Sequence, residues 1–493
     1  MVTAFVVLYF GVLILLCAYG LHRLHLVMSC ARHRRRIDRV AEVAPVPEDE
    51  LPRVTVQLPL YNEATVTARL LDAVALMDYP ADRLEVQVLD DSTDETRSIA
   101  EAKVRELAAQ GLDIVYIRRP NRHGYKAGAL DYGLARASGE LVAVFDADFV
   151  PQPDFLRRVV PHFQNPNTAM VQTRWGHMNR DHSLLTSVQA LMLDGHHMVE
   201  NRARYGSQCF FNFSGTGGIW RVAAIHDAGG WEHDTLTEDL DLSYRAQLKG
   251  WRFVYRQDVV TPAEVPEDLS AFRAQQYRWA KGTVQTARKL LGRVMRSDLG
   301  LTQRVEAFFH LTPHFAYPLM LLLSILILPA LILLPAVDVK TMFIVDLPLC
   351  FGATGSLATF YCLAERAQGR SVFGALKRLP ALIALGAGLS PHLTRAVFDG
   401  LKNMSGEFVR TPKRGSQLGR YRQAAQLPYI EIGLCLVSIA SVVASIETGH
   451  WFATPFTLLF ALGYGYVALT VTREQLASRA VKETEPEQLP RVA

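Results

Sequence analysis

The feature that most constrains this chain is a set of long apolar runs at its two ends. Residues 2–21 carry no charged side chain, and the C-terminal third contains four more such runs, one of which includes a single aspartate. About 20 apolar residues are enough for a helix to cross the hydrocarbon core of a bilayer. The chain is therefore predicted to be an integral, multi-pass protein of the inner or plasma membrane. The C-terminal runs cover residues 315–337, 341–363, 432–446 and 451–471.

Basic residues beside these runs predict their orientation. Five arginines lie between positions 32 and 39, directly after the first run. A cleaved signal peptide would carry its positive charge before the apolar core, so the first run is predicted to be an uncleaved anchor with its N-terminus outside. The apolar stretch 379–390 is short and has basic residues on both sides. It is interpreted as an interfacial or re-entrant helix, which leaves five spans.

These patterns predict one large polar domain set between membrane segments. The predicted parts are an N-terminal transmembrane anchor (1–27), a catalytic domain (50–314), a transmembrane pair (315–363), a cytosolic or interfacial segment (364–428), a second transmembrane pair (429–471) and a cytosolic tail (472–493).

Composition excludes several other classes of protein. The 52 basic and 48 acidic residues give a formal net charge of +4, which is too balanced to argue for a protein that binds nucleic acid. The six cysteines form no CxxC pair, so neither a structural zinc site nor a disulfide framework is indicated.

The polar block begins with alternating strands and helices. Strands are predicted at residues 54–60, 84–89, 114–118 and 141–145, with a helix after each of the first three. Continuous apolar strands separated by helices predict a parallel α/β sheet. Ligands of such sheets bind beyond the carboxyl ends of the strands. Polar clusters stand at three of those ends: Tyr61 to Glu63, Asp90 to Ser92, and Asp146 to Asp148.

Each cluster also has an ordinary structural explanation. Asp146 and Asp148 could hold a divalent cation beside phosphate oxygens, although such a triplet is also common in turns. Asp90 and Asp91 suit a helix N-terminus. Lys126 follows a glycine at a predicted helix start, where a lysine and backbone N–H groups could meet phosphate together.

Two further groups lie later in the block. Glu238 and Asp239 open a predicted helix, where they could complement its dipole or act as a general base. Arg278 and Trp279 could brace a diphosphate and stack on a sugar, or belong to an amphipathic helix lying on the membrane.

Together these motifs resemble the membrane-embedded family 2 glycosyltransferases, which include cellulose synthase and the cellulose synthase-like mannan and glucomannan synthases. The matching runs, in family order, are Pro59 to Glu63, Asp90 to Asp94, Lys126 to Gly128, Asp146 to Asp148, Thr237 to Asp239, and Gln275 with Arg278 and Trp279. The resemblance implies a cytosolic GT-A (Rossmann-like α/β) catalytic domain plus an α-helical transmembrane region. It also implies a nucleotide-sugar donor, a divalent metal (Mg²⁺ or Mn²⁺) and inversion at the transferred sugar.

The resemblance assigns roles residue by residue. Asp239 would be the catalytic base beside Glu238, Arg278 would stabilise the leaving diphosphate, and Asp148 with Asp146 would hold the metal. Trp279 would stack on the acceptor, with the loop residues Ser214, Gly215 and Thr216 around the acceptor end. The donor-binding residues would be Tyr61, Glu63, Asp90, Asp91, Lys126, Asp146 and Gln275. Residues 408–413 resemble the cytosolic gating loop of the family, or else form a basic loop that binds anionic lipid.

Three functions remain open at this stage. The first is a processive synthase that adds hexose from UDP-glucose or GDP-mannose to a β-linked polysaccharide and exports it through its own spans. The second is a glycolipid synthase that adds one hexose to a membrane lipid acceptor. The third is a transporter or scaffold without catalysis, which would have no need for the acidic strand ends.

Overall fold

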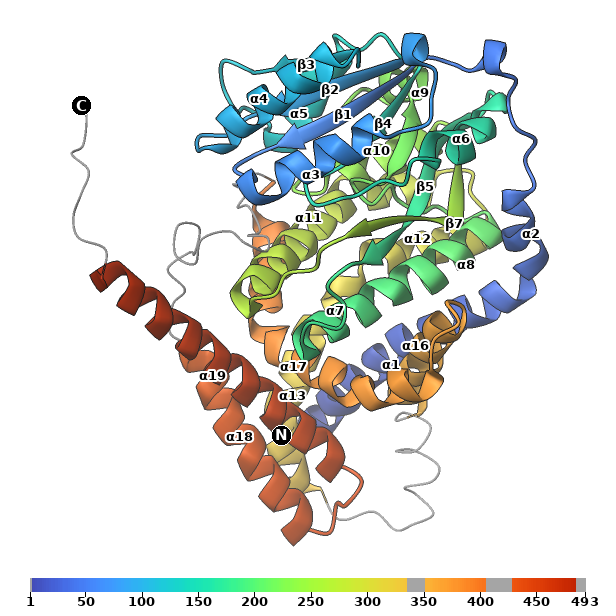
Figure 1. The fold of residues 1–493 in the computed structure, drawn as a ribbon. Helices are drawn as coiled ribbons and strands as arrows, with labels where there is room; N and C mark the ends of the chain where they lie inside the picture. The colour runs from blue at the N-terminus through green and yellow to red at the C-terminus, as the bar shows by residue number, and fades with distance from the viewer. Residues whose placement is uncertain (1, 335–350, 405–427, 485–493) are drawn as a thin grey trace.

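In the computed structural model, a mixed α/β domain sits on a bundle of long helices (Figure 1). The structure describes residues 2–334, 351–404 and 428–484. The strands of its single sheet are β1 (Val54–Leu60), β2 (Leu84–Asp90), β3 (Ile114–Ile117), β4 (Leu141–Val144), β5 (Thr168–His177), β6 (Gly218–Arg221) and β7 (Arg252–Ala263). The helices of the domain are α3 (Ala64–Ala75), α4 (Thr96–Ala109), α5 (Tyr125–Leu134), α6 (Phe155–Val159), α7 (Leu184–Gly195), α8 (Asn201–Ser207), α9 (Val222–Asp227), α10 (Glu238–Leu248), α11 (Leu269–Arg296) and α12 (Leu301–Leu311). Outside the domain, the α-helices of the described residues are α1 (Val2–Arg32), α2 (Arg34–Asp38), α13 (Ala316–Leu333), α16 (Ser356–Arg366), α17 (Val372–Lys402), α18 (Tyr429–Glu447) and α19 (Thr454–Thr484).

The sheet has the order β3-β2-β1-β4-β6-β5-β7. Its first four strands pair in parallel, with Val54 opposite Leu84 and Leu141, as the strand–helix alternation predicts. The second half of the sheet differs from the parallel prediction, because β6 runs antiparallel to both β4 and β5. The result is the mixed sheet of a GT-A domain, and it brings the loop before β6 next to the end of β4.

The sheet is buried on both faces, which explains why its strands read as continuous apolar runs. One core cluster packs Val56 and Leu58 of β1 against α3, α4 and α6. The other packs Val142 and Val144 of β4 against α5, α9 and α10. Helices on both faces leave the carboxyl ends of the strands as the open edge, and the polar clusters lie there.

Five helices among the described residues are long and apolar enough to cross a membrane, as judged by length and composition. They are Thr3–Arg32, Pro313–Leu333, Val372–Lys402, Tyr429–Glu447 and Thr454–Ala477. The stretch 379–390 is thus part of a continuous 31-residue helix, α17, rather than a short separate one. The expected span 341–363 lies partly outside the described residues, as does the whole gating-like stretch 408–413. The interfacial interpretation of 379–390 and the topology of the spans stay predictions.

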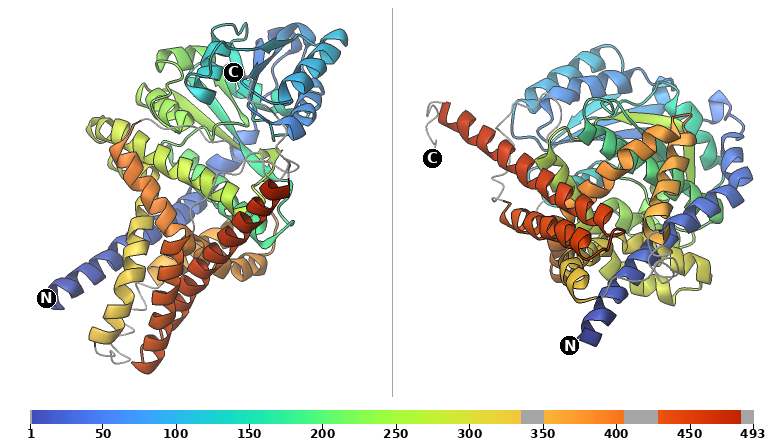
Figure 2. Two further views of the ribbon diagram at one scale, coloured as in Figure 1. Left: turned by 90° about the vertical axis from the view of Figure 1, so that its left-hand side faces the viewer. Right: turned by 90° about the horizontal axis from the view of Figure 1, so that it is seen from below.

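Buried ion pairs fasten the domain to α1 and α16. Glu306 of α12 accepts from Arg204 of α8 at 2.9 Å and lies 2.8 Å from His22 of α1. Arg180 likewise joins Asp194 of α7 to Glu365 of α16. Such pairs are expensive to break, because loss of one partner leaves the other charge buried. Figure 2 shows the long helices gathered on one side of the domain.

Candidate active site

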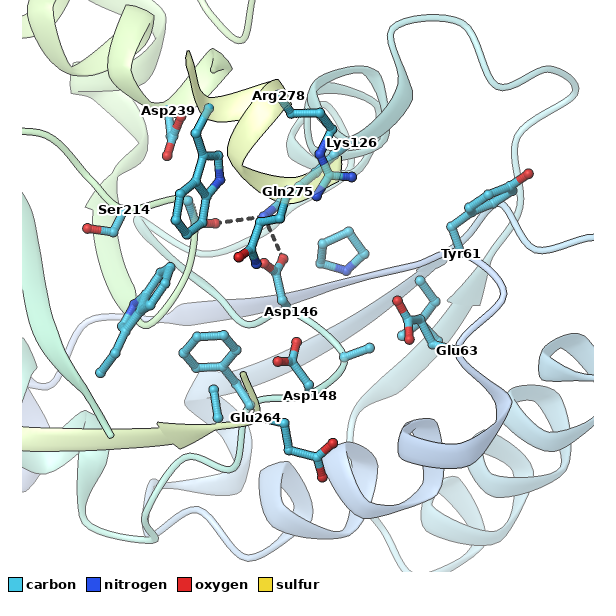
Figure 3. Close-up of a pocket in the computed structure, with 18 of the residues that line it drawn as sticks. Tyr61, Glu63, Lys126, Asp146, Asp148, Ser214, Asp239, Glu264, Gln275 and Arg278 are labelled. Atoms are coloured by element: carbon cyan, nitrogen blue, oxygen red, sulfur yellow. Dashed lines mark hydrogen bonds and ion pairs between the residues drawn. The ribbon is translucent and has the colours of Figure 1, made fainter. Parts of the chain in front are cut away.

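A cleft opens at the carboxyl edge of the sheet and contains nearly all the residues predicted from the sequence (Figure 3). Those that line it are Tyr61, Glu63, Asp91, Lys126, Asp146, Asp148, Ser214, Gly215, Glu238, Asp239, Gln275, Arg278 and Trp279. They come from segments more than 200 residues apart in the chain. The sheet topology brings the ends of β1, β2 and β4 together, and α10 and α11 supply the remaining wall.

Two predicted residues lie beside the cleft rather than in its lining. Asp90 is buried under the sheet edge, where it accepts from the Tyr116 hydroxyl at 2.6 Å and from the backbone N–H of Ser92 at 2.8 Å. Thr216 is also buried, and its hydroxyl accepts from the backbone N–H of Asp146 at 2.8 Å. In this structure both side chains hold neighbouring loops in place.

Lys126 forms the centre of the cleft. The chain enters α5 through Gly124, whose φ of +72° suits glycine, and this turn directs Lys126 towards the end of β4. Its ammonium donates to Asp146 Oδ1 at 2.5 Å and to the carbonyl of Gly215 at 2.8 Å (Figure 3). Burial lowers the pKa of Lys126, but Asp146 and Glu238 outweigh burial and hold that pKa above its usual value. A fixed positive charge therefore stands where a diphosphate could bind.

Asp239 faces this charge from the start of α10. Its Oδ1 accepts from the backbone N–H of Leu240 at 2.9 Å, which orients the carboxylate. A Cβ added at Gly215 would lie 3.2 Å from Asp239 Oδ2, so the loop backbone passes close to the carboxylate. Burial and the adjacent charge of Glu238 raise the pKa of Asp239 to about 7. A carboxylate with a pKa near neutrality is suited to accept a proton from a hydroxyl group.

Helix α11 supplies the opposite wall through Gln275, Arg278 and Trp279. Burial lowers the pKa of Arg278 to about 10, although the negative charges of Glu238, Asp146 and Glu63 act in the other direction. Arg278 therefore remains a cation at neutral pH. Trp279 lines the same cleft as Asp239 and offers an indole ring on which an acceptor sugar could stack.

Gln172 of β5, which the sequence did not single out, holds the loop that carries Ser214 and Gly215. Its buried amide accepts from the backbone N–H of Ser214 at 2.8 Å and donates to the carbonyl of Thr216 at 3.1 Å. Since Thr216 also bonds the backbone of Asp146, the loop of residues 214–216 and the loop that carries Asp146 are linked into one unit. A single glutamine in a strand carries no sequence signal for this role.

Two arginines that sequence reasoning missed lie at the end of the cleft formed by Tyr61 and Asp91: Arg122 lines the cleft, and Arg119 lies behind Asp91. Arg119 pairs with both oxygens of Asp91, at 3.0 and 2.5 Å, and so fixes that carboxylate. The Arg122 guanidinium lies 3.3 Å from the centroid of the Tyr61 ring. The available signal was the cluster of basic residues in the polar loop just before Lys126.

Trp175 and His177, at the end of β5, line the cleft together with Leu193 of α7. The Trp175 ring packs against the rings of Phe149 and His197, at centroid distances of 5.3 and 5.1 Å. His177 Nε2 lies 3.5 Å from a carboxylate oxygen of Asp194. These residues were missed because their strand belongs to the half of the sheet with no clear sequence pattern.

Comparison with known proteins identifies the family of the chain. A family model described as "Glycosyltransferase like family 2" matches residues 52–282. Glucomannan 4-beta-mannosyltransferase 1 from Oryza sativa is 35% identical over 89% of this chain and 88% of its own length. Glucomannan 4-beta-mannosyltransferase 2 from Arabidopsis thaliana is 38% identical over 78% of this chain and 72% of its own length.

Among solved structures, the chain is similar to that of the mannosyltransferase PcManGT from Pyrobaculum calidifontis in complex with GDP-Man and Mn²⁺. The match has a TM-score of 0.49 and 24% identity, and it covers 71% of this chain and 97% of the other.

The fold and the cleft define a membrane-associated GT-A enzyme that transfers a hexose. The chain belongs to the family 2 glycosyltransferases, within the group that includes the cellulose synthase-like proteins.

Proposed function

We propose that this enzyme transfers mannose from GDP-mannose to a growing β-1,4-linked mannan or glucomannan chain, with UDP-glucose as the second candidate donor. The curated relatives with 33% to 38% identity that support this proposal are named glucomannan 4-beta-mannosyltransferases. The observation that carries it is a single cleft that brings together Asp239, with a pKa of about 7, the indole of Trp279 and the ion pair of Lys126 with Asp146.

In the proposed reaction, Asp239 accepts the proton of an acceptor hydroxyl as that oxygen attacks the anomeric carbon of the donor sugar. The bond between the anomeric carbon and the diphosphate oxygen breaks on the opposite face, so the configuration inverts. Negative charge develops on the departing diphosphate. Lys126 and Arg278, both held in the cleft as cations, stabilise that charge through electrostatics arranged in advance of the reaction. Stacking on Trp279 would hold the acceptor in line.

Asp148 and Asp146 would hold a divalent cation in this scheme. Both line the cleft, and the side chains offer the hard oxygen ligands that Mg²⁺ and Mn²⁺ prefer. Asp148 is only 4% exposed, so its carboxylate is placed for contact inside the cleft rather than with bulk solvent. When bound, the metal would supply additional positive charge to the diphosphate of the donor.

We also propose that the catalytic domain faces the cytosol and that the product leaves through the enzyme's own spans. The basic residues between α1 and the domain support this orientation by the positive-inside rule. The packing of α8 against α1 and of α11 against α17 and α19 supports a direct route from cleft to membrane (Figure 2).

The test is to incubate purified full-length enzyme with labelled GDP-mannose and, separately, with UDP-glucose, in the presence of Mg²⁺ or Mn²⁺. The product is then sized and digested with linkage-specific glycosidases. We expect a polymer formed from GDP-mannose and cut by β-1,4-mannanase. A lipid carrying a single hexose would refute the polymer synthase, and no transfer from either donor would refute the proposed function.

A further inference from the structure

The N-terminus of α11 is completed by a residue from the far end of the chain. Asp268 precedes the helix without capping it. Instead, Glu474 of α19 accepts from the backbone N–H groups of Leu269 at 2.9 Å and Ser270 at 3.1 Å, and also from the Ser270 hydroxyl. The first N–H groups of a helix have no partner within it, and a carboxylate there also complements the helix dipole. Glu474 thus caps the N-terminus of α11, a role that a serine or aspartate directly before the helix usually has.

The next turns of α11 contact the two other C-terminal helices. Arg273 donates to Glu431 of α18 at 3.2 Å, and both side chains are mostly buried, with exposed fractions of 15% and 7%. His392 of α17 lies with its Nε2 3.2 Å from the carbonyl of Arg273. The Tyr277 hydroxyl donates to Asp399, which is also on α17. Polar contacts from α17, α18 and α19 therefore converge on the first three turns of α11.

These are the turns that form the wall of the cleft. Gln275, Arg278 and Trp279 line the cleft, and Trp279 lies only ten residues after Leu269, about 15 Å along the helix axis. A shift of the N-terminal half of α11 would move the indole relative to Asp239. It would leave Tyr61 and Asp91 in place, because they follow strands of the sheet at the nucleotide end.

We infer that Glu474 and Glu431 are positioning residues for the acceptor: they hold α11 so that Trp279 stands at the right place, and thereby couple the C-terminal helix pair to sugar transfer. The inference rests on the proposed transfer to a glycan acceptor. The inference predicts weaker binding of the acceptor and unchanged binding of the nucleotide, because the contacts act on the acceptor wall of the cleft and not on the nucleotide end.

The test uses full-length enzyme in lipid nanodiscs with a β-1,4-mannooligosaccharide acceptor. The variants are Glu474→Ala, Glu474→Gln, Glu431→Arg, Arg273→Glu and the double exchange Arg273→Glu with Glu431→Arg. Glu447→Gln, an exposed acid at the other end of α18, is the matched control. The measured quantities are kcat, the KM for the acceptor, the dissociation constant of GDP and the thermal unfolding midpoint.

We expect Glu474→Ala and each single charge reversal to raise the acceptor KM about tenfold, because the loss of a helix cap or of an ion pair lets the N-terminal half of α11 shift. The GDP dissociation constant should not change. Glu474→Gln keeps an acceptor oxygen and should lose less, and the double exchange should recover much of the acceptor binding because it restores opposite charges.

Acceptor KM values equal to that of Glu447→Gln would overturn the inference. So would a parallel loss of GDP affinity and of thermal stability, since the contacts would then only hold the fold together. Wild-type enzyme that transfers nothing to the oligosaccharide would refute the proposed function itself, and the inference would fall with it.

Discussion

The charge of Glu238 is predicted to control the pH at which the enzyme becomes active. Asp239 must be ionised to accept a proton, and burial together with Glu238 raises its pKa from 3.8 to about 7. Activity should therefore fall as the pH drops below about 7, because Asp239 becomes protonated. Replacing Glu238 by Gln removes the like charge but keeps the shape of the side chain. The pKa of Asp239 should then fall, and the acid limb of the profile should move to lower pH.

The expected fall in the pKa of Asp239 depends on how much of its raised value comes from burial and how much from Glu238. Burial is the larger cause of the raised pKa and remains in the variant, so we expect a fall of about one unit, typical of a close like charge. With a pKa of about 7, about a tenth of Asp239 is ionised at a pH one unit below that value. With a pKa one unit lower, about half of Asp239 is ionised at the same pH. The fraction of active enzyme at that pH should therefore rise about fivefold relative to its plateau.

The assay is the pH dependence of kcat/KM for sugar transfer, since this ratio reports the free enzyme. Glu101→Gln, which removes an exposed charge on α4, is the matched control and should leave the profile unchanged. An acid limb that does not move in Glu238→Gln would refute the electrostatic reasoning. An equal shift in Glu101→Gln would show that net charge, rather than Glu238, sets the limb.

Three further predictions concern the residues of the cleft. Asp239→Asn should lower kcat by about 10²- to 10⁴-fold with little change in GDP affinity. Initial rates measure the first quantity and calorimetry the second. Near-normal turnover would exclude Asp239 as the base. Asp148→Asn should weaken Mn²⁺ activation about tenfold or more in a metal titration of the rate, because one oxygen ligand becomes neutral; an unchanged titration would place the metal elsewhere. His177→Phe keeps a ring of similar size but loses the nitrogen that faces Asp194, so we expect kcat/KM to fall about tenfold without loss of GDP affinity. Wild-type kinetics in that variant would mean that His177 only fills space.

The sequence predicted the first half of the sheet well and the second half poorly. The strands β1 to β4 are continuous apolar runs separated by helices, and the structure confirms their parallel pairing. β6 has only four residues and carries no periodic pattern, so its antiparallel direction was not predictable. The direction of β6 matters because it brings the loop with Ser214 and Gly215 next to Lys126.

The sequence by itself determined the chemistry that the chain can perform. The chemical groups are visible in the sequence: spaced carboxylates, a lysine that closely follows a glycine, and an arginine–tryptophan pair. They occur along the chain in the order typical of the family. Their positions beyond strand ends also followed from local pattern, because parallel strands present their carboxyl ends on one edge.

Only the tertiary structure decided which of these groups meet and what charge they carry. The pKa of Asp239 depends on burial beside Glu238, and the cation at Lys126 depends on Asp146 and Glu238. The cap that Glu474 provides to α11 joins residues 205 positions apart. Such effects arise from distance and solvent exclusion in the folded chain, and neither quantity can be read from the order of residues along it.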